Sequence, residues 1–352
     1  MNSKISRFEL RPGYSISRVI KGGWHLAGGH GRIDEQQAIL DMKSFVEAGV
    51  TTFDCADIYT GVETLIGKFL RRYRGAFVSD NLPSVQIHTK YVPDENALAT
   101  LTKEDTTAVI DRSLKRLGVE RLDLVQFAWW NYEIPGYVET ALHLTELQQA
   151  GKIRFIGATN FDAKRMEEML LAGAPIVANQ VQYSVLDRRP EAAMTALAQK
   201  FDFALLCYGV IAGGYLSDRY LGAIETDAAL ENRSLVKYRL IIDEFGGYAL
   251  FQKALSFLHE IAQKYKVGVA EIAAKYVLQK PSVAGVIVGA RNARHLKNLL
   301  KLEHFELDAD DLKIIDVVVE KAQGPVGPVY ELERDRNGKH GKIMRYNLNG
   351  QR

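Results

Sequence analysis

Eight short apolar segments alternate with amphipathic helical patterns along this chain, and this alternation limits the possible folds more than any other feature. Strands are predicted at residues 17–23, 51–53, 85–88, 121–127, 152–161 with its loop, 178–184, 203–207 and 283–288. Strands joined through helices run parallel, and right-handed crossovers that close on themselves form a barrel. We therefore predict an α/β fold, a (β/α)8 TIM barrel in a single domain, with the barrel at about residues 15–320 and a C-terminal tail at 323–352.

Helix boundaries in this pattern have typical capping residues. Asp34 opens a helix that Gly49 ends, as expected for an N-cap carboxylate and a C′ glycine. Thr102 opens another helix with Asp105 three residues later, a variant of the capping box, and Gly118 ends it. These caps place one helix before the strand at 51–53 and one before the strand at 121–127.

The charge balance argues against two classes of partner. The 352 residues include 45 basic and 43 acidic side chains, which are interspersed and leave a formal net charge of +2. This predicts neither a nucleic-acid-binding nor a membrane-binding surface. The N-terminus lacks the apolar core of a signal peptide, and no apolar run is long enough to span a membrane, so we expect a cytoplasmic protein. The sequence leaves the oligomeric state open.

Cysteine usage argues against a disulfide framework. The two cysteines, Cys55 and Cys207, both lie inside apolar strand-like segments. We expect two buried free thiols and no metal site.

The segment at 51–59, Thr-Thr-Phe-Asp-Cys-Ala-Asp-Ile-Tyr, contains the strongest candidates for chemistry. Asp54 is predicted at the C-terminal end of a buried strand, Tyr59 follows just after it, and Lys90 ends the next strand-like segment. Strand ends that lead into βα loops are where α/β folds gather their functional groups. A lone strand-end lysine is more often a solvated surface group, so Lys90 needs further support.

That support comes from a family resemblance. The spacing Asp-x-Ala-x-x-Tyr followed by Glu63 and Gly67, and the run Gly-Lys-Ile-Arg-Phe-Ile-Gly-Ala-Thr-Asn-Phe at 151–161, resemble the aldo-keto reductases over about residues 15–320. The resemblance implies hydride transfer between NADP and a small-molecule carbonyl or alcohol. It further implies that Tyr59 is the general acid or base, that Lys90 lowers the tyrosine pKa, and that Asp54 pairs with Lys90 and positions it.

The same resemblance implies three residues that bind the nicotinamide. Asn160 and Gln180 match the positions that hydrogen-bond its carboxamide group. Tyr208 ends the seventh predicted strand and corresponds to the aromatic residue that stacks on the ring, which would direct one face of C4 toward the substrate.

A second part of the cofactor site is predicted after the last strand. Gly289 opens a glycine turn that leads into a helix N-terminus, where free N–H groups and the helix dipole favour an anion. Arg291 and Arg294 add positive charge that suits the 2′-phosphate of NADP. The family pattern is matched only partly around His295, so NAD is the less favoured alternative.

Ala128 departs from the family pattern, which has a histidine at the end of this strand. The histidine donates a hydrogen bond to the substrate carbonyl, and loss of one such donor typically reduces the rate by roughly 10²- to 10³-fold. Either Trp129, Trp130 or Asn131 supplies another donor, or the reaction differs, or the protein is a cofactor-binding sensor or regulatory subunit with little turnover.

Aromatic residues suggest the shape of the substrate pocket. Trp24 follows the first predicted strand, and Trp129, Trp130 and Tyr132 follow Ala128. We expect Trp24, Ala128 and Trp129 to line the pocket and to favour a bulky apolar substrate. Two segments remain ambiguous: residues 209–247 are either locally helical or a lid, and the tail either closes over the substrate or is a mobile terminus.

Overall fold

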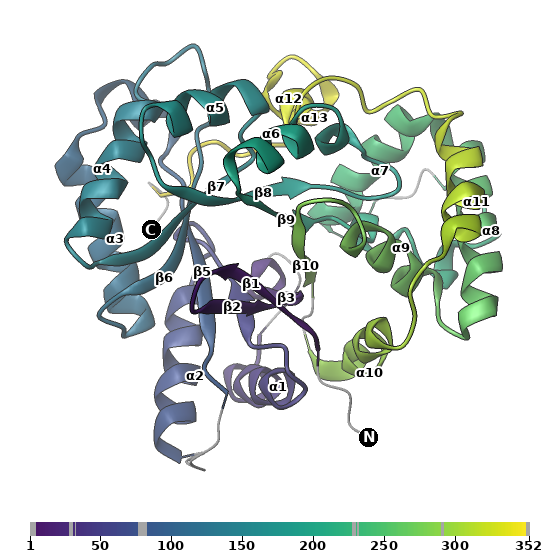
Figure 1. The fold of residues 1–352 in the computed structure, drawn as a ribbon, viewed down its shortest axis with the longest axis horizontal. Helices are drawn as coiled ribbons and strands as arrows, with labels where there is room; N and C mark the ends of the chain where they lie inside the picture. The colour runs from purple at the N-terminus through teal and green to yellow at the C-terminus, as the bar shows by residue number, and fades with distance from the viewer. Residues whose placement is uncertain are drawn as a thin grey trace.

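The structure, a computed structural model, describes residues 5–27, 31, 33–76, 83–226, 230, 232–289 and 292–349. Eight parallel strands form a closed barrel in which the last strand pairs with the first (Figure 1). The strands are β3 (Val19–Gly22), β4 (Thr52–Asp54), β5 (Gln86–Tyr91), β6 (Leu122–Phe127), β7 (Ile153–Thr159), β8 (Ile176–Gln182), β9 (Ala204–Tyr208) and β10 (Val283–Gly289). The predicted (β/α)8 barrel is confirmed.

An antiparallel hairpin precedes the barrel and was not expected from the sequence. It consists of β1 (Arg7–Arg11) and β2 (Tyr14–Ser17), and β2 leads directly into the start of β3. The Tyr14 hydroxyl lies 3.1 Å from Nε2 of His88, a buried residue of β5. The hairpin therefore packs at the N-terminal end of the barrel, which leaves the C-terminal end for the site.

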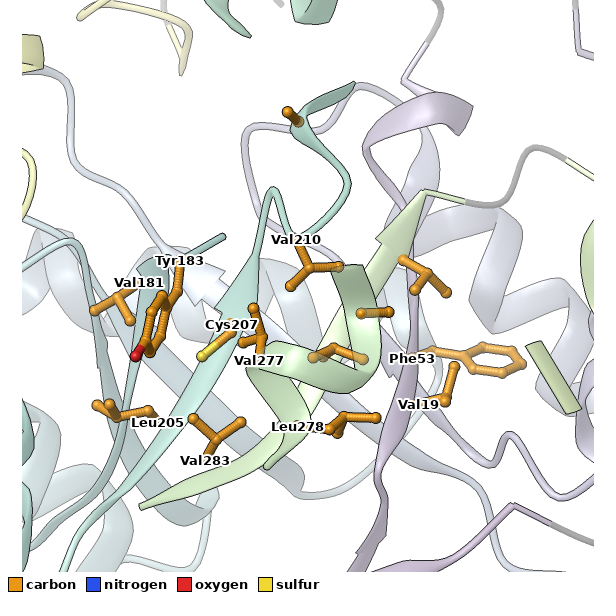
Figure 2. Packing of buried hydrophobic residues seen from close by; sticks show 14 of the residues in the cluster. Val19, Phe53, Val181, Tyr183, Leu205, Cys207, Val210, Val277, Leu278 and Val283 are labelled. Atoms are coloured by element: carbon orange, nitrogen blue, oxygen red, sulfur yellow. The ribbon is translucent and has the colours of Figure 1, made fainter. Parts of the chain in front are cut away.

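Helices surround the barrel, and apolar side chains fill the space between the two layers. These helices are α1 (Glu35–Glu47), α2 (Val62–Ala76), α3 (Lys103–Leu117), α4 (Tyr137–Gln149), α5 (Ala163–Leu171), α6 (Met194–Phe201), α8 (Gly247–Tyr265), α9 (Val269–Leu278), α10 (Leu296–Leu300) and α11 (Ala309–Val319). Figure 2 shows Val277 and Leu278 of α9 next to Cys207 and Val283 of the barrel, and all four belong to one buried cluster. Both cysteines are free and buried, as expected.

The predicted helix caps form as the residue types require. The side chain of Asp34 accepts a hydrogen bond from the Gln37 N–H at the start of α1. Thr102 and Asp105 form a reciprocal capping box at the start of α3, and Gly118 ends this helix with φ of 67°. The helix α4 begins at Tyr137, where Gly136 with φ of 119° turns the chain into it.

The ambiguous segment at 209–247 is locally helical. It contains η4 (Ala212–Gly214), η5 (Asp218–Tyr220) and α7 (Arg233–Phe245). No helix in the described part of the chain is both long and apolar enough to cross a membrane.

The tail forms two short helices, α12 (Glu331–Arg334) and α13 (Lys339–Lys342), and α13 contacts α7 (Figure 1). The Glu333 carboxylate is 1 % exposed and lies 3.0 Å from the Arg189 guanidinium and 3.6 Å from the Lys237 ammonium. A buried ion pair of this kind anchors the tail on the barrel, so the described tail is packed and not a loose terminus.

Candidate active site

The ends of β4 and β5 bring the three predicted catalytic residues together. Nζ of Lys90 donates hydrogen bonds to Oδ2 of Asp54 at 2.6 Å and to the Cys55 carbonyl at 2.9 Å. The same ammonium lies 5.0 Å from the centre of the Tyr59 ring. Both charged side chains are almost fully buried. The three residues form one cluster, consisting of a buried ion pair beside a phenol.

The second carboxylate oxygen of Asp54 accepts two further hydrogen bonds. Oδ1 accepts hydrogen bonds from Nε2 of Gln126 at 3.0 Å and from Nε2 of Gln180 at 2.7 Å, and the two glutamines bond to each other at 2.8 Å. A buried carboxylate needs such partners because its desolvation is otherwise costly. Gln126 was missed in the sequence, although a glutamine inside the apolar segment at 121–127 was a usable signal.

Burial and charge act in opposite directions on the Tyr59 phenol. Burial raises its pKa, Lys90 lowers it, and Asp54 raises it again, so the net pKa lies above the usual value. Lys90 lowers the pKa of the phenol as expected, but burial has the larger effect, so the net shift is upward. Burial would lower the pKa of Lys90, but Asp54 and Tyr59 outweigh it and raise that pKa. At neutral pH the phenol is therefore protonated and the ammonium is charged.

A cavity of about 1110 Å³ opens over this cluster at the C-terminal end of the barrel. Its volume lies slightly above the usual range of about 300–1,000 Å³ for small-molecule and cofactor sites. Eleven of the twelve predicted site residues belong to the described chain, and ten of these line it: Trp24, Asp54, Tyr59, Lys90, Ala128, Trp129, Asn160, Gln180, Tyr208 and Gly289. The Trp24 ring packs edge-on against the Tyr59 ring with centroids 5.2 Å apart.

The three residues predicted to hold the nicotinamide are neighbours in space. The Tyr208 hydroxyl donates to Oδ1 of Asn160 at 2.9 Å. Asn160 has φ of 63°, and its N–H donates to the Gln180 carbonyl at 2.8 Å. Nε2 of Gln180 is directed to Asp54 and Gln126, so this amide supports the ion pair as well as lining the cavity.

Glycines leave the cavity wall open where a phosphate-bearing cofactor would need space. Gly213 and Gly214 have φ of 64° and 108°, and a Cβ at Gly213 would lie 2.7 Å from the Tyr238 ring. A Cβ at Gly289 would lie 2.3 Å from Cε1 of His25. A side chain at Gly213 or Gly289 would force its neighbours to move, so main chain forms these parts of the cavity wall.

The two arginines predicted to bind the cofactor phosphate near Gly289 are not found among the described residues that line the cavity. Arg291 lies outside the described residues. Arg294 is exposed at η6 (Ala293–His295) and does not line the cavity, whereas His295 and Asn298 do. Among the described residues of this turn, the basic residue that lines the cavity is therefore His295 and not Arg294.

Trp129 and Trp130, the neighbours of Ala128, differ in whether the indole N–H already has a hydrogen-bond partner. The Trp129 side chain is 2 % exposed, and its indole N–H donates to the Ile134 carbonyl at 2.9 Å, so its ring belongs mainly to the core. The indole nitrogen of Trp130 is buried and has no hydrogen-bond partner in the described part of the chain. The Trp130 ring packs edge-on against Tyr346 of the tail at 5.3 Å.

The tail contributes residues that the sequence did not identify as part of the site. Arg334 donates to the Asn160 carbonyl at 2.7 Å and to the Trp129 carbonyl at 3.3 Å, and its guanidinium lies 4.0 Å from the centre of the Tyr132 ring. These contacts hold the backbone of the predicted carboxamide-binding residue. No local pattern could reveal them, because the partners are far apart in sequence.

Comparisons with known proteins agree with this geometry. The family model described as "Aldo/keto reductase family" matches residues 18–320. The chain is 26% identical over 326 residues to the aldo-keto reductase YhdN of Bacillus subtilis, covering 90% of this chain and 95% of that protein. It is 26% identical over 320 residues to the L-glyceraldehyde 3-phosphate reductase of Escherichia coli O157:H7, covering 88% and 91%. Among solved structures, the glycerol dehydrogenase of Gluconobacter oxydans shares the fold, with a TM-score of 0.73, 22% identity and coverage of 90% and 95%.

Proposed function

The chain belongs to the aldo/keto reductase family and is an oxidoreductase of that family, and we propose that Tyr59 is its general acid and base. In this proposal a hydride moves between C4 of a nicotinamide cofactor and the carbon of a small-molecule carbonyl or alcohol. The observation that carries the proposal is the Lys90 ammonium, which lies 2.6 Å from Asp54 and 5.0 Å from the Tyr59 ring in a cavity of cofactor size.

Tyr59, Lys90 and Asp54 have different roles in the proposed proton transfer. The raised pKa of Tyr59, caused by burial, keeps the phenol protonated, which is the form that donates a proton to a developing alkoxide. Lys90 stabilises the phenolate that remains after the transfer, because the ammonium lies beside the ring. Asp54 orients Lys90, and Gln126 with Gln180 holds Asp54 in turn.

We propose NADP as the cofactor, with NAD as the alternative. Bound nicotinamide supplies the hydride in reduction and accepts it in oxidation. Asn160, Gln180 and Tyr208 would hold the nicotinamide end, and the wall formed by Gly213 and Gly289 would lie along the phosphates. Quenching of protein fluorescence by NADPH and by NADH measures the preference, and equal dissociation constants would contradict it.

Ala128 favours a second candidate, a cofactor-binding sensor or regulatory subunit with little turnover. Alanine provides no donor for a substrate oxygen, and the indole N–H of Trp129 is already bonded to Ile134. Trp130 remains the neighbour whose indole nitrogen has no partner among the described residues.

One experiment separates the two candidates. Single-turnover oxidation of bound NADPH is followed by absorbance with aliphatic, aromatic and α,β-unsaturated carbonyl compounds, using wild type, Tyr59→Phe and Ala128→His. An enzyme should turn over at least one compound, and Tyr59→Phe should lose about 10²- to 10⁴-fold in rate while still binding NADPH. Tight NADPH binding without oxidation in the wild type would instead support the sensor. Rescue by Ala128→His would then assign the lost turnover to the missing histidine.

A further inference from the structure

Two arginines from distant parts of the chain line the same end of the cavity. Arg233 is the first residue of α7, and Arg345 follows α13 in the tail. One guanidinium nitrogen of Arg233 donates to the Ile343 carbonyl at 3.2 Å, which joins α7 to the tail two residues before Arg345. The folded tail therefore brings the two cations into one site.

The arginines lie next to the predicted reaction centre. Cζ of Arg233 is 6.0 Å from the centre of the Trp24 ring, and that ring packs edge-on against Tyr59 at 5.2 Å. On the other side, Tyr346 packs against Trp130, which is close in sequence to Ala128. The tail segment at 343–348 thus lines the cavity near Trp24 and Trp130. The Trp24 ring lies between Arg233 and Tyr59.

The positive charge of this pair is not balanced within the described part of the chain. No carboxylate among the described residues lies within ion-pair distance of either guanidinium. The carboxylates that line the cavity have other partners: Asp54 binds Lys90 at 2.6 Å, Asp218 binds the Val269 N–H at 3.1 Å, and Glu271 binds the Gly268 N–H at 2.8 Å. Burial lowers the pKa of Arg233, and the like charge of Arg345 lowers it further.

Arg233 is half-buried and Arg345 is exposed, and both line the cavity. Two neighbouring cations in a concave site favour an anion over a neutral ligand. We propose that Arg233 and Arg345 bind an anionic group of the substrate, a carboxylate or a phosphate, while its carbonyl carbon lies at Tyr59. A guanidinium is planar and presents paired N–H donors that match either group. The proposal rests on the proposed function and adds the substrate class: an anionic carbonyl compound, whose intervening part lies against Trp24.

The position of the pair separates this site from the predicted end for the cofactor phosphate. That end is the turn after β10, where Gly289, His295 and Asn298 line the cavity. Arg233 instead contacts Trp24 and the Ile343 carbonyl of the tail, and Arg345 follows two residues later. We assign anion binding by this pair to the substrate, and the effect of the double variant on NADPH affinity tests this against a contact with the cofactor phosphates along Gly213.

The test compares matched substrates that differ in charge. One pair is 4-carboxybenzaldehyde and its methyl ester, and the other is glycolaldehyde phosphate and glycolaldehyde. Wild type should prefer the anionic member of at least one pair by roughly tenfold or more in kcat/KM, because a hydrogen bond to a charged group typically has that effect. The pair with the larger preference distinguishes carboxylate from phosphate. The double variant Arg233→Gln/Arg345→Gln should lose the preference and retain kcat/KM for the neutral member within about threefold.

Lys342→Gln is the matched control. Lys342 is an exposed residue at the end of α13, directly before the tail segment at 343–348, and it does not line the cavity. Its replacement therefore changes the net charge only. The control should keep the preference of the wild type. Equal loss in Lys342→Gln and in the double variant, or no preference in the wild type, would overturn the proposal. It would also be overturned if the double variant lost NADPH affinity and kept the preference, because the pair would then serve the cofactor.

A binding measurement keeps the result independent of turnover. The NADP-loaded protein is titrated calorimetrically with 4-(hydroxymethyl)benzoate and with its methyl ester. Tighter binding of the carboxylate, lost in the double variant, supports the anion site even if no carbonyl compound is turned over and the proposed function fails. Turnover of neutral aldehydes together with equal binding of acid and ester would contradict the anion site and leave the proposed function standing.

Discussion

Two carboxyl groups three residues apart are in opposite environments. Asp54 faces an ammonium and two amide donors, so its negative charge is compensated. Asp57 is fully buried, and burial together with the charge of Glu63 raises its pKa to about 8, although N–H groups of Val92 and Ile58 act against this. Two residues of the same type therefore differ in the polar partners that the fold gives them.

The raised pKa of Asp57 predicts a pH-dependent stability. The folded chain holds the proton up to about pH 8, while the unfolded chain releases it near 3.8, the ordinary pKa of an aspartate. Asp57 therefore reduces stability progressively as pH rises from about 4 to about 8. The isosteric Asp57→Asn should leave stability nearly unchanged at pH 4 and increase it by several kcal/mol at pH 8. Urea unfolding at the two pH values measures this, and an equal effect at both would contradict it.

At the scale of elements, the ends of helices and the short helices of the tail decide what the site contains. Gly118 ends α3 in a left-handed conformation just before β6, the strand that carries Gln126. The tail helix α12 places Glu333 between the buried Arg189 and the half-buried Lys237, and places Arg334 against the backbone of Asn160. The effect of each element on the site depends on where it ends.

Gly118→Ala should destabilise the protein. Its φ is 67°, and an added Cβ would lie 2.9 Å from a guanidinium nitrogen of Arg71. We expect a loss of about 1–2 kcal/mol in the free energy of unfolding. The control is Gly75→Ala inside α2, where a Cβ would meet no atom within 4 Å and where alanine favours the helix by about 1 kcal/mol. Thermal or urea unfolding should move in opposite directions for the two variants.

Glu333 predicts a second pH dependence, with the opposite sign. Burial raises the pKa of this carboxyl, but Lys237 and Arg189 outweigh burial and lower it to about 2 from the ordinary glutamate value of 4.5. Its ionised form therefore stabilises the fold above pH 4.5, and that contribution is lost as pH falls toward 2. Glu333→Gln should lose roughly 3 kcal/mol at pH 7 and less at pH 3. A pH-independent difference between variant and wild type in urea unfolding would argue against it.

At the scale of the whole molecule, the tail and the barrel share one set of buried contacts. Glu333 joins the tail to Arg189, and Arg334 joins it to the ends of β6 and β7. Near the end of the described chain, the N–H groups of Leu348 and Asn349 donate to Asp94, in the segment that follows β5. The tail therefore crosses the mouth of the barrel and is held at both ends of its path.

This arrangement predicts that the chain unfolds as one unit, consistent with the proposal of a single domain. Hydrogen exchange followed by mass spectrometry in increasing urea should show residues 324–349 and the barrel strands losing protection at the same urea concentration. If the tail lost protection first, at a lower concentration, the tail and barrel would be separate cooperative units. Binding of NADPH should then be measured at that concentration to find whether the tail is needed for it.

The sequence by itself determined the barrel and the candidates for its catalytic cluster. The eight strands, the helix caps and the strand-end positions of Asp54 and Tyr59 follow from local patterns, because strand alternation and strand ends are encoded within a few residues, whereas Lys90 became a candidate through the family resemblance. Cofactor roles for Asn160, Gln180 and Tyr208 remain predictions, although the fold brings these residues together.

Only the tertiary structure decided which polar groups meet. Burial outweighed the lowering of the Tyr59 pKa by Lys90, Gln126 joined Asp54, and the tail brought Arg345 to Arg233. These features depend on residues far apart in the chain and on the water that packing removes. Neither the distances between such residues nor their desolvation is encoded in a local pattern, so the sequence could supply the groups but not their environment.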